Sequence, residues 1–293
     1  MKKNPSFNVH TESELLSFLL KCFDNKSRNY VKGILKRGQV TIDGNVCTNH
    51  AHRLQPGQQV DIILQTTAIR QNKMNLPIIY EDDDIIVIDK PAGMLAVSTE
   101  KEQEHTAFHI VNEYIKSRNK AGRIFIVHRL DRETSGIMLL AKSERIKHTL
   151  QDNWNNNVIR RGYIAVVEGH VQPPQRRIMS WLKQTKSLLV YSSAGKDNGK
   201  LAITNYQVMQ TSATHSLLDI SLETGRKNQI RVHMKDIGHP IVGDKKYGAH
   251  TDPLARLGLH ASVLIINHPS SNEQLRLESA MPSTFMSLFG MHK

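Results

Sequence analysis

Cysteine is almost absent from this sequence, and long apolar runs are missing. The two cysteines, Cys22 and Cys47, lie far apart and lack Cys-x-x-Cys spacing, which excludes a disulfide framework and a cysteine zinc site. We expect both to be partly buried thiols in a reducing compartment. Because no apolar run could span a bilayer and Met1 to Pro5 contain no signal core, we expect a cytoplasmic protein without a membrane partner.

Acidic residues are also in deficit. Asp and Glu number 27 against 39 for Lys and Arg, a net charge of +12. Such a surplus favours a polyanionic partner, most often nucleic acid, although many basic proteins bind none. A hydrophobic content of 39% excludes a disordered chain, and 293 residues leave room for a large domain and a small one.

A small basic module is predicted first, at residues 13 to 64. Its first helix is expected around residues 14 to 22. A second helix, from Arg28 to about Arg37, is capped by Ser27 and stopped by Gly38. The strand 39 to 42 and the Asp43-Gly44-Asn45 turn predict a hairpin, and the strand 60 to 64 closes the module. Cations recur at every fourth position of the second helix and form a stripe: Arg28, Lys32 and Lys36.

The run from Ser27 through Gly38-Gln39-Val40-Thr41-Ile42-Asp43-Gly44 to Val60 resembles the αL RNA-binding domain. The resemblance implies that the cation stripe contacts RNA, whereas a solvated basic helix is the alternative. The polar segment 65 to 77 predicts a boundary near residue 70. We therefore expect a small RNA-binding domain at 1–70 and a catalytic domain at 71–293.

Strand patterns dominate the remainder of the chain. Short apolar runs at 85–88, 124–127, 137–141, 163–167 and 217–222 predict strands. Helices are expected at 106–118, 143–153 and 228–237, and the last places Ile230, Met234 and Ile237 on one stripe. The predicted fold class is α+β, built on a long, largely antiparallel sheet with flanking helices.

One turn between two predicted strands carries an acidic residue, in the run His128-Arg129-Leu130-Asp131-Arg132-Glu133-Thr134-Ser135-Gly136. An isolated Asp in a turn is usually only a turn former. This run, followed by Ala141-Lys142, resembles the signature of the RluA family of pseudouridine synthases. Other stretches agree with that family in order: Lys90-Pro91-Ala92-Gly93, the run 161–169 with Tyr163, the run 222–233 with Gln229-Ile230-Arg231, and the run 238–248.

The resemblance implies isomerisation of uridine to pseudouridine in structured RNA, with ribosomal RNA preferred to transfer RNA. It implies no metal and no small-molecule cofactor, and a monomer is the default expectation. Asp131 is the essential carboxylate, acting either as a nucleophile or as a base on the ribose. By resemblance, Arg231 keeps Asp131 ionised and Tyr163 stacks on the uracil. Further RNA contacts are expected from Arg129, His128, Arg226, Lys227 and Asn228.

The sequence departs from the family pattern at Asn228, where His is common, and at Arg161, where Lys is common. Two other functions remain as alternatives. A noncatalytic RNA-binding or ribosome-assembly factor would not need Asp131, Tyr163 and Arg231 together. A carboxylate-based nucleoside hydrolase would call for a second paired carboxylate or a metal cluster, and for no RNA-binding module.

Overall fold

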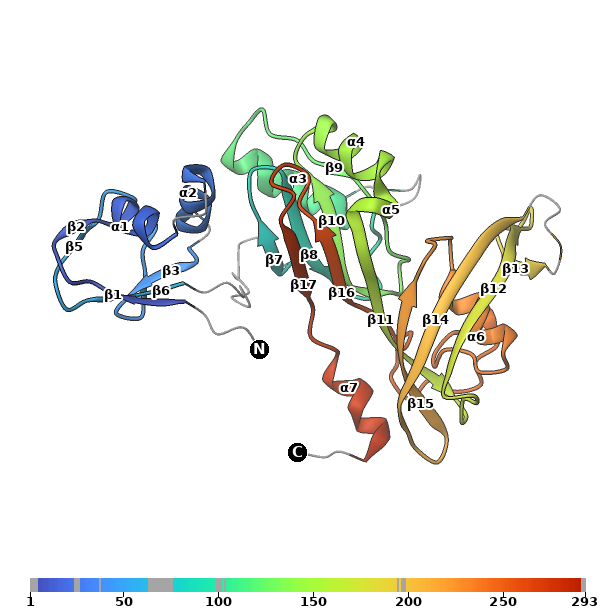
Figure 1. The fold of residues 1–293 in the computed structure, drawn as a ribbon. Helices are drawn as coiled ribbons and strands as arrows, with labels where there is room; N and C mark the ends of the chain where they lie inside the picture. Colours follow the sequence, from blue (N-terminus) through green and yellow to red (C-terminus); the bar gives the residue numbers. More distant parts are fainter. Residues whose placement is uncertain are drawn as a thin grey trace. The chain divides into compact units, whose positions relative to one another are not determined.

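The structure, a computed structural model, describes residues 5–23, 27–36, 38–62, 76–98, 102, 104–193, 195 and 199–290. The chain divides into two compact units (Figure 1). The small unit comprises Met1–Ile69 with Tyr80–Asp83, and the large unit comprises Arg70–Ile79 with Asp84–Lys293. The residues around the expected boundary, 63–75, lie outside the described residues.

The small unit contains both expected helices. They are α1 (Leu15–Cys22) and α2 (Arg28–Lys36). The Ser27 hydroxyl accepts from the backbone N–H of Tyr30 at 3.2 Å, and Gly38 ends the helix with a φ of 67°. The two helices pack together through side chains that are almost fully buried: Leu15, Leu19, Val31, Ile34 and Leu35. Local capping signals therefore located α2 correctly.

The sheet of the small unit is larger than the predicted hairpin and closing strand. Its order is β1 (Ser6–Asn8), β6 (Gln59–Ile62), β3 (Val40–Ile42) and β4 (Asn45–Val46), and β2 (Ser13–Glu14) pairs with β5 (Arg53–Leu54). Asp43 and Gly44 form the expected turn with φ of 49° and 81°. The prediction missed β1, β2 and β5 because such short strands carry no readable alternation.

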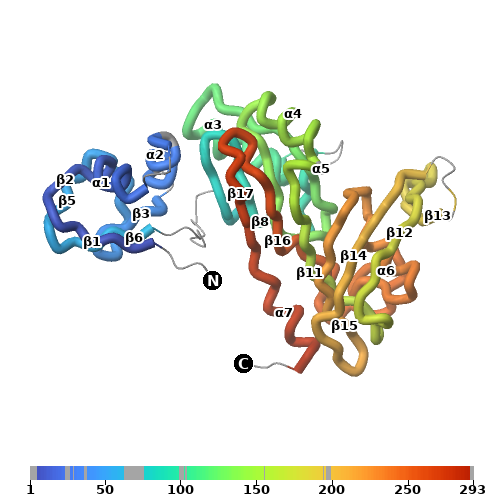
Figure 2. The backbone as a smooth tube through the Cα atoms, in the orientation of Figure 1, coloured from blue at the N-terminus to red at the C-terminus, as the bar shows by residue number. Residues whose placement is uncertain are grey.

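The large unit is built on one 11-stranded sheet (Figures 1 and 2). Its strand order is β13-β12-β14-β15-β11-β16-β10-β8-β7, with β17 beside β16 and β9 beside β10. The strands are β7 (Ile78–Glu81), β8 (Ile85–Lys90), β9 (Phe125–Ile126), β10 (Ser135–Ala141), β11 (Val158–Glu168), β12 (Gln175–Gln184), β13 (Val190–Ser193), β14 (Lys200–Thr211), β15 (His215–Leu222), β16 (Leu259–Asn267) and β17 (Gln274–Glu278).

The sheet is largely antiparallel, as predicted, with a parallel pair between β10 and β16. Its helical segments are α3 (Ala107–Arg118), α4 (Glu144–Asp152), α5 (Trp154–Asn157), α6 (Gln229–Asp236), η1 (Lys245–Tyr247), α7 (Ser283–Met286) and η2 (Ser287–Phe289). Thr106 and Ser143 cap α3 and α4 through their side-chain oxygens. The structure therefore confirms the expected α+β class and the three expected helices.

Two apolar clusters hold the helices on the sheet. Val111 and Ile115 of α3 pack on Ile86, Ile88 and neighbouring strand residues. Ile230 and Met234 of α6 pack on Tyr206, Leu218 and Ile220, as the predicted stripe requires. Tyr163 of β11 contacts both clusters. The residues that precede β10 and those on α6 therefore approach the same central strand.

Gly136 allows β10 and β16 to pair closely. Its φ is 109°, and a Cβ there would lie 2.2 Å from the carbonyl oxygen of Ala261, which no real side chain tolerates. Only glycine fits at the point where the parallel pair begins, directly after the acidic turn. The glycine of the motif is thus explained by packing.

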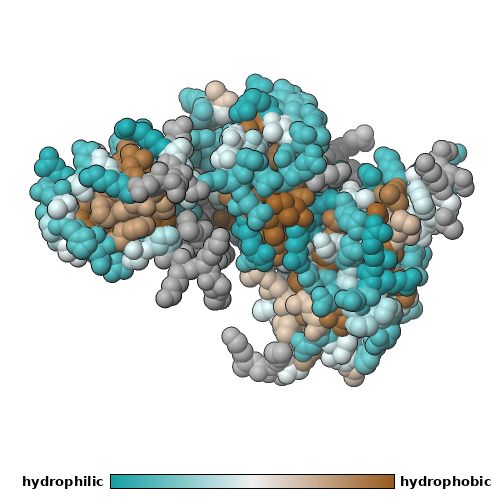
Figure 3. Space-filling model, viewed as in Figure 1, coloured by the Kyte–Doolittle hydropathy of each residue, from teal (hydrophilic) through white to brown (hydrophobic). Residues whose placement is uncertain are grey.

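Hydrophilic residues make up most of the visible surface, with apolar residues showing between them (Figure 3). In the described part of the chain, no helix is long and apolar enough to span a membrane.

Candidate active site

Asp131 lies in the loop between β9 and β10, and this loop is anchored on both sides of the residue. The Leu130 side chain is buried in the cluster beneath α3. On the other side, the backbone N–H of Thr134 donates to the Asp131 carbonyl at 3.2 Å, which closes a turn. The Asp131 side chain keeps 27% of its surface exposed. The carboxylate is thus held by a rigid loop and is still accessible to a substrate.

Lys90, the first residue of the Lys-Pro turn, donates a hydrogen bond to this loop. It is fully buried, and its Nζ donates to the carbonyl oxygens of Pro91, Met94 and Arg132 at 2.9, 2.8 and 3.1 Å. Arg132 returns the contact, because its Nε donates to the Gly93 carbonyl at 2.9 Å. The ammonium group therefore ties the turn after β8 to the residue next to Asp131.

Replacing Lys90 with Met is expected to lower the free energy of unfolding by roughly 2–4 kcal/mol, because carbonyl oxygens lose a charged donor in a buried place. Chemical denaturation measures this loss.

Burial lowers the pKa of Lys90 to about 8 from 10.5. Between pH 8 and pH 10.5 the unfolded chain binds more protons at this lysine than the folded protein does. The free energy of unfolding of the wild type therefore rises with pH in this interval, and that of Lys90→Met does not. Lys116→Met, at an exposed lysine, is the matched control.

Arg231 on α6 faces Asp131 but forms its closest contacts elsewhere. Its Nε and Nη2 each donate at 2.7 Å to the two carboxylate oxygens of Asp244, whose side chain is fully buried. The remaining nitrogen, Nη1, lies 3.8 Å from Oδ2 of Asp131. That distance permits an ion pair but is too long for a hydrogen bond. Asp244 therefore fixes the guanidinium, and Nη1 of Arg231 faces Asp131.

Asn228 and Tyr247 complete the surroundings of the carboxylate. Asn228 precedes α6, is only 7% exposed, and its side-chain amide reaches both Asp131 and the Tyr247 hydroxyl. The Tyr247 ring lies 4.9 Å below the Arg231 guanidinium. Expected as an RNA contact, Asn228 instead lies buried beside Asp131.

Burial and charge act in opposite directions on Asp131. Burial raises the pKa of Asp131, whereas Arg231, Arg129 and Lys227 oppose the rise. Asp244 adds a smaller repulsion that raises the pKa further. The carboxylate is therefore more basic than a free aspartate, and its cations favour the ionised form.

Tyr163 lies on β11 in an environment that keeps its phenol protonated. Burial raises the pKa of Tyr163 to about 12; Arg161 opposes this rise and the Asp131 charge adds to it. A protonated phenol at neutral pH is a flat ring and a hydrogen-bond donor, not a ready base.

Exposed cations surround the site. Arg129, Arg226 and Lys227 are exposed, and their role as phosphate contacts stays a prediction. Arg226 is also held in place, since its Nε donates to the Leu201 carbonyl at 3.0 Å. Arg161, which replaces the family's Lys, donates to the Glu223 carbonyl at 2.7 Å and lies 5.9 Å from the Trp154 ring.

His128 differs from the expectation of an RNA contact. Its Nε2 accepts from the backbone N–H of Leu139 at 3.0 Å, and its ring lies 5.5 Å from that of Trp154. Burial, reinforced by Arg161, lowers the pKa of His128 to about 4, so the ring is neutral and suited to accept. Its observed role is to attach the acidic loop to β10.

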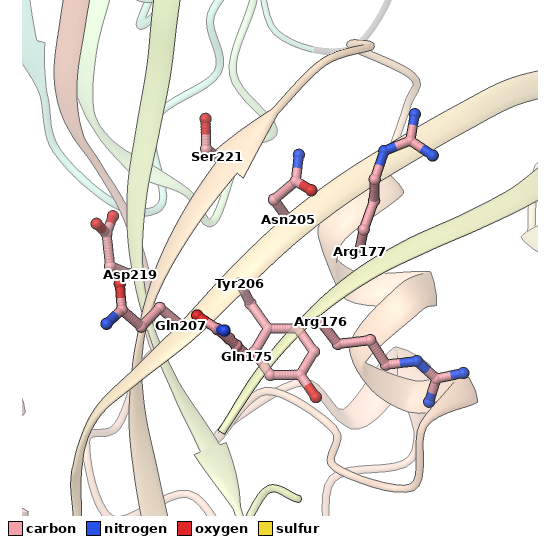
Figure 4. A pocket seen from close by; sticks show the side chains of 8 residues that line it. All are labelled: Gln175, Arg176, Arg177, Asn205, Tyr206, Gln207, Asp219 and Ser221. Atoms are coloured by element: carbon pink, nitrogen blue, oxygen red, sulfur yellow. The ribbon is translucent and has the colours of Figure 1, made fainter. Parts of the chain in front are cut away.

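A groove of about 490 Å³ lies away from these residues, on β12, β14 and β15 (Figure 4). It is lined by Gln175, Arg176, Arg177, Asn205, Tyr206, Gln207, Asp219 and Ser221. Two of its charged side chains are paired within the sheet: Arg177 binds Glu223 at 2.8 Å and Asp219 binds Arg160 at 2.7 Å. None of the predicted catalytic residues lines it.

Lys90, Asp244 and Tyr247 were not singled out from the sequence. Each belongs to a stretch that carries the family resemblance, namely Lys-Pro-Ala-Gly or Gly-Asp-Lys-Lys-Tyr-Gly. Hydrophobic periodicity and local charge patterns do not identify a residue whose contacts are made with a distant part of the chain. The available signal was that these stretches match the family in the same order as the acidic motif does. Among the described residues, no cluster of potential metal ligands occurs.

Comparisons with known proteins show the family of this chain. The family model described as RNA pseudouridylate synthase matches residues 84–236. A Bacillus subtilis protein named as an uncharacterized RNA pseudouridine synthase is 32% identical, over 92% of this chain and 91% of its own length. Ribosomal large subunit pseudouridine synthase D of Pseudomonas aeruginosa is 31% identical, over 92% of this chain and 88% of its own.

Solved structures share the fold. Human RNA pseudouridylate synthase domain containing 4 matches with a TM-score of 0.59 and 24% identity, covering 71% of this chain and 90% of that protein. The matched family region contains Asp131, Tyr163, Asn228 and Arg231, and the last two lie beside the Asp131 carboxylate. The chain therefore belongs to the RNA pseudouridylate synthase family, whose members are isomerases that convert uridine to pseudouridine in RNA.

Proposed function

We propose that this chain isomerises specific uridines in ribosomal RNA of the large subunit, with Asp131 as its essential carboxylate. The observation that carries the proposal is the placement of Asp131: it is partly exposed, rigidly held, and 3.8 Å from an arginine whose other nitrogens are occupied by Asp244. The names of its relatives, ribosomal large subunit pseudouridine synthases, support ribosomal RNA as the substrate. We further propose a cytoplasmic enzyme that acts as a monomer.

The reaction breaks the bond between the ribose anomeric carbon and nitrogen 1 of uracil. Asp131 either attacks that carbon or removes a proton from the neighbouring ribose carbon. The freed uracil leaves as an anion at nitrogen 1 and turns. Its carbon 5 then bonds to the anomeric carbon, while the ester bond to Asp131 breaks in the first route or Asp131 returns the proton to the ribose in the second. Carbon 5 finally loses its proton and nitrogen 1 gains one, so the product is an isomer of uridine. Both routes need ionised Asp131, which Arg231 favours. Tyr163 offers a ring on which the uracil stacks while it turns.

The target uridine lies in folded RNA and must leave its stack before it reaches Asp131. In this proposal, Arg129 fills or braces the vacated position, and Arg226 and Lys227 hold phosphates beside it. All three are exposed cations, which supports these roles.

The test is a map of pseudouridines in a strain that lacks the gene. We expect loss at one or a few uridines of large-subunit ribosomal RNA, restored by the wild-type gene and not by a copy encoding Asp131→Asn. Loss confined to transfer RNA would refute the substrate class. Restoration by Asp131→Asn would refute the catalytic role of the carboxylate.

The cation stripe of α2 is the proposed RNA contact of the small unit. Arg28 and Lys32 are exposed, whereas Val31, Ile34 and Leu35 are buried. The Lys36 side chain lies outside the described residues. A helix with one buried apolar face and one exposed basic face suits a polyanion.

We expect Arg28→Glu with Lys32→Glu to weaken RNA binding and to reduce the slope of log affinity against log salt by roughly two, since each lost phosphate contact removes about one unit. Filter binding over a salt series measures the slope. Lys116→Glu with Lys120→Glu produces the same change of net charge on exposed residues of the large unit. An unchanged slope in the α2 variant would remove this helix from the binding surface.

A further inference from the structure

We propose that Asn228, oriented by the Tyr247 hydroxyl, is a positioning residue that aims the Asp131 carboxylate and keeps it ionised. The inference rests on the proposed function, because it acts through Asp131. It assigns a definite role to the position at which this chain carries Asn in place of the family's common His.

The orientation of the Asn228 amide follows from its partners. With its nitrogen toward Asp131, the amide donates to Oδ2 at 2.7 Å and approaches Oδ1 at 3.3 Å, and its oxygen accepts from the Tyr247 hydroxyl at 2.9 Å. The reverse orientation would set the amide carbonyl against a carboxylate, acceptor against acceptor. With the nitrogen toward Asp131, the hydrogen bonds of the chain Tyr247–Asn228–Asp131 all run in one direction, from the hydroxyl to the carboxylate.

Tyr247 is placed to donate. It is 3% exposed, and Arg231 lies over its ring at 4.9 Å. Burial raises the pKa of Tyr247, so the hydroxyl retains the proton that it gives to Asn228. Because Asp244 and Tyr247 belong to one short turn, the same element holds Arg231 and Asn228.

Asn228 is itself held rigidly. Its backbone is left-handed, with a φ of 54° and a ψ of 19°, a conformation that Asn adopts more readily than most residues. The next residue, Gln229, accepts from Thr224 and Arg226 and donates to the Ile203 carbonyl. These bonds fix the start of α6, and with it the position of the amide.

Arg231 cannot fix the orientation of the Asp131 carboxylate. At 3.8 Å its Nη1 gives Asp131 a favourable charge but no hydrogen bond. The amide donates a short hydrogen bond to Oδ2 and a longer one, of 3.3 Å, to Oδ1, so it fixes the plane of the carboxylate. A donated hydrogen bond favours the ionised carboxylate. Arg231 therefore contributes a positive charge, and Asn228 contributes the hydrogen bond that orients the carboxylate.

The test uses two replacements that suit a left-handed backbone. Asn228→Gly removes the amide, and Asn228→Asp keeps its shape but places a carboxylate beside Asp131. For each we expect kcat to fall by roughly 10- to 100-fold with KM for the RNA little changed, as loss of a hydrogen bond to a charged group predicts. We also expect the acid limb of the kcat–pH profile to move to higher pH, further for Asn228→Asp.

Several charged or titratable groups share this site and are common to all variants: Arg129, Arg231, Lys227, Lys90, Asp244 and Tyr163. Their contribution cancels when the profiles are compared. Asn272→Gly is the matched control, since Asn272 also has a left-handed backbone, with a φ of 56°, and is exposed. It should retain the wild-type profile.

Tyr247→Phe keeps the ring under Arg231 and removes only the hydroxyl. If Tyr247 acts through Asn228, the double variant Asn228→Gly with Tyr247→Phe should be no slower than Asn228→Gly alone. Additive losses would overturn the relay. If Asn228→Gly keeps the wild-type kcat and acid limb and Asp131→Asn is inactive, the proposed role of Asn228 is wrong. If Asp131→Asn is active, the proposed function itself is wrong.

Discussion

Asp131→Asn is expected to lower the rate of pseudouridine formation by at least roughly 10³-fold, the scale on which removal of an enzymatic nucleophile or base acts. An amide at this position is neither nucleophile nor base. RNA affinity should be largely unchanged, because the phosphate contacts proposed for Arg129, Arg226 and Lys227 remain. Release of tritium from carbon 5 of labelled uridine in the RNA measures the rate. Asp152→Asn, at an exposed aspartate of α4, is the control.

The same substitution should also reveal the cost of burying the carboxylate. Burial raises the pKa of Asp131 above 3.8, against the attraction of its cations. The folded protein therefore binds this proton more tightly than the unfolded chain does, and its stability falls as pH rises through the interval between the two pKa values. We expect Asp131→Asn to be at least as stable as wild type at pH 7, with no advantage below about pH 4.

Activity is expected to have the opposite dependence on pH, because the proposed reaction requires ionised Asp131. The acid limb of kcat is expected above the ordinary range of an aspartate carboxyl. A limb near pH 3.8 would contradict the raised pKa of Asp131. Stability and activity thus conflict at this residue, as is common where a binding site is built around a buried charge.

Asp244→Asn is expected to be the most destabilising of the single substitutions at the site. The side chain is fully buried and accepts two hydrogen bonds of 2.7 Å from Arg231. Loss of its charge leaves a buried guanidinium with a single counter-ion 3.8 Å away. Removing one partner of a buried pair typically costs about 3–5 kcal/mol, so urea denaturation should show a loss of this size.

Asp219→Asn provides a matched comparison. It breaks the contact of Arg160 with Asp219, also at 2.7 Å, but both side chains are about one-third exposed, 35% and 34%. An exposed pair contributes about 0–1 kcal/mol, so the same chemical change should cost much less there. Equal losses in the two variants would show that burial of Arg231 and Asp244 does not govern their contribution. A reduced kcat in folded Asp244→Asn would further connect the pair to Asp131.

Much of the local structure followed from the sequence alone. Helices α2, α3 and α4 begin where Ser27, Thr106 and Ser143 cap them, because capping bonds join residues three apart. The Asp43–Gly44 turn followed from its left-handed requirement. The acidic motif, read with the other matching stretches, indicated the family and named Asp131, Tyr163 and Arg231.

The tertiary structure decided what those residues touch. Lys90 reaches the loop of Asp131 across 42 positions of sequence, and β10 pairs with β16 across 125. Asp244 and Tyr247 meet Arg231 and Asn228 only because η1 folds against α6. Local patterns encode contacts within a few residues, whereas the identity of a buried charge's partner depends on which segments the sheet brings together. The sequence therefore predicted which carboxylate acts, and the fold determined which side chains surround it.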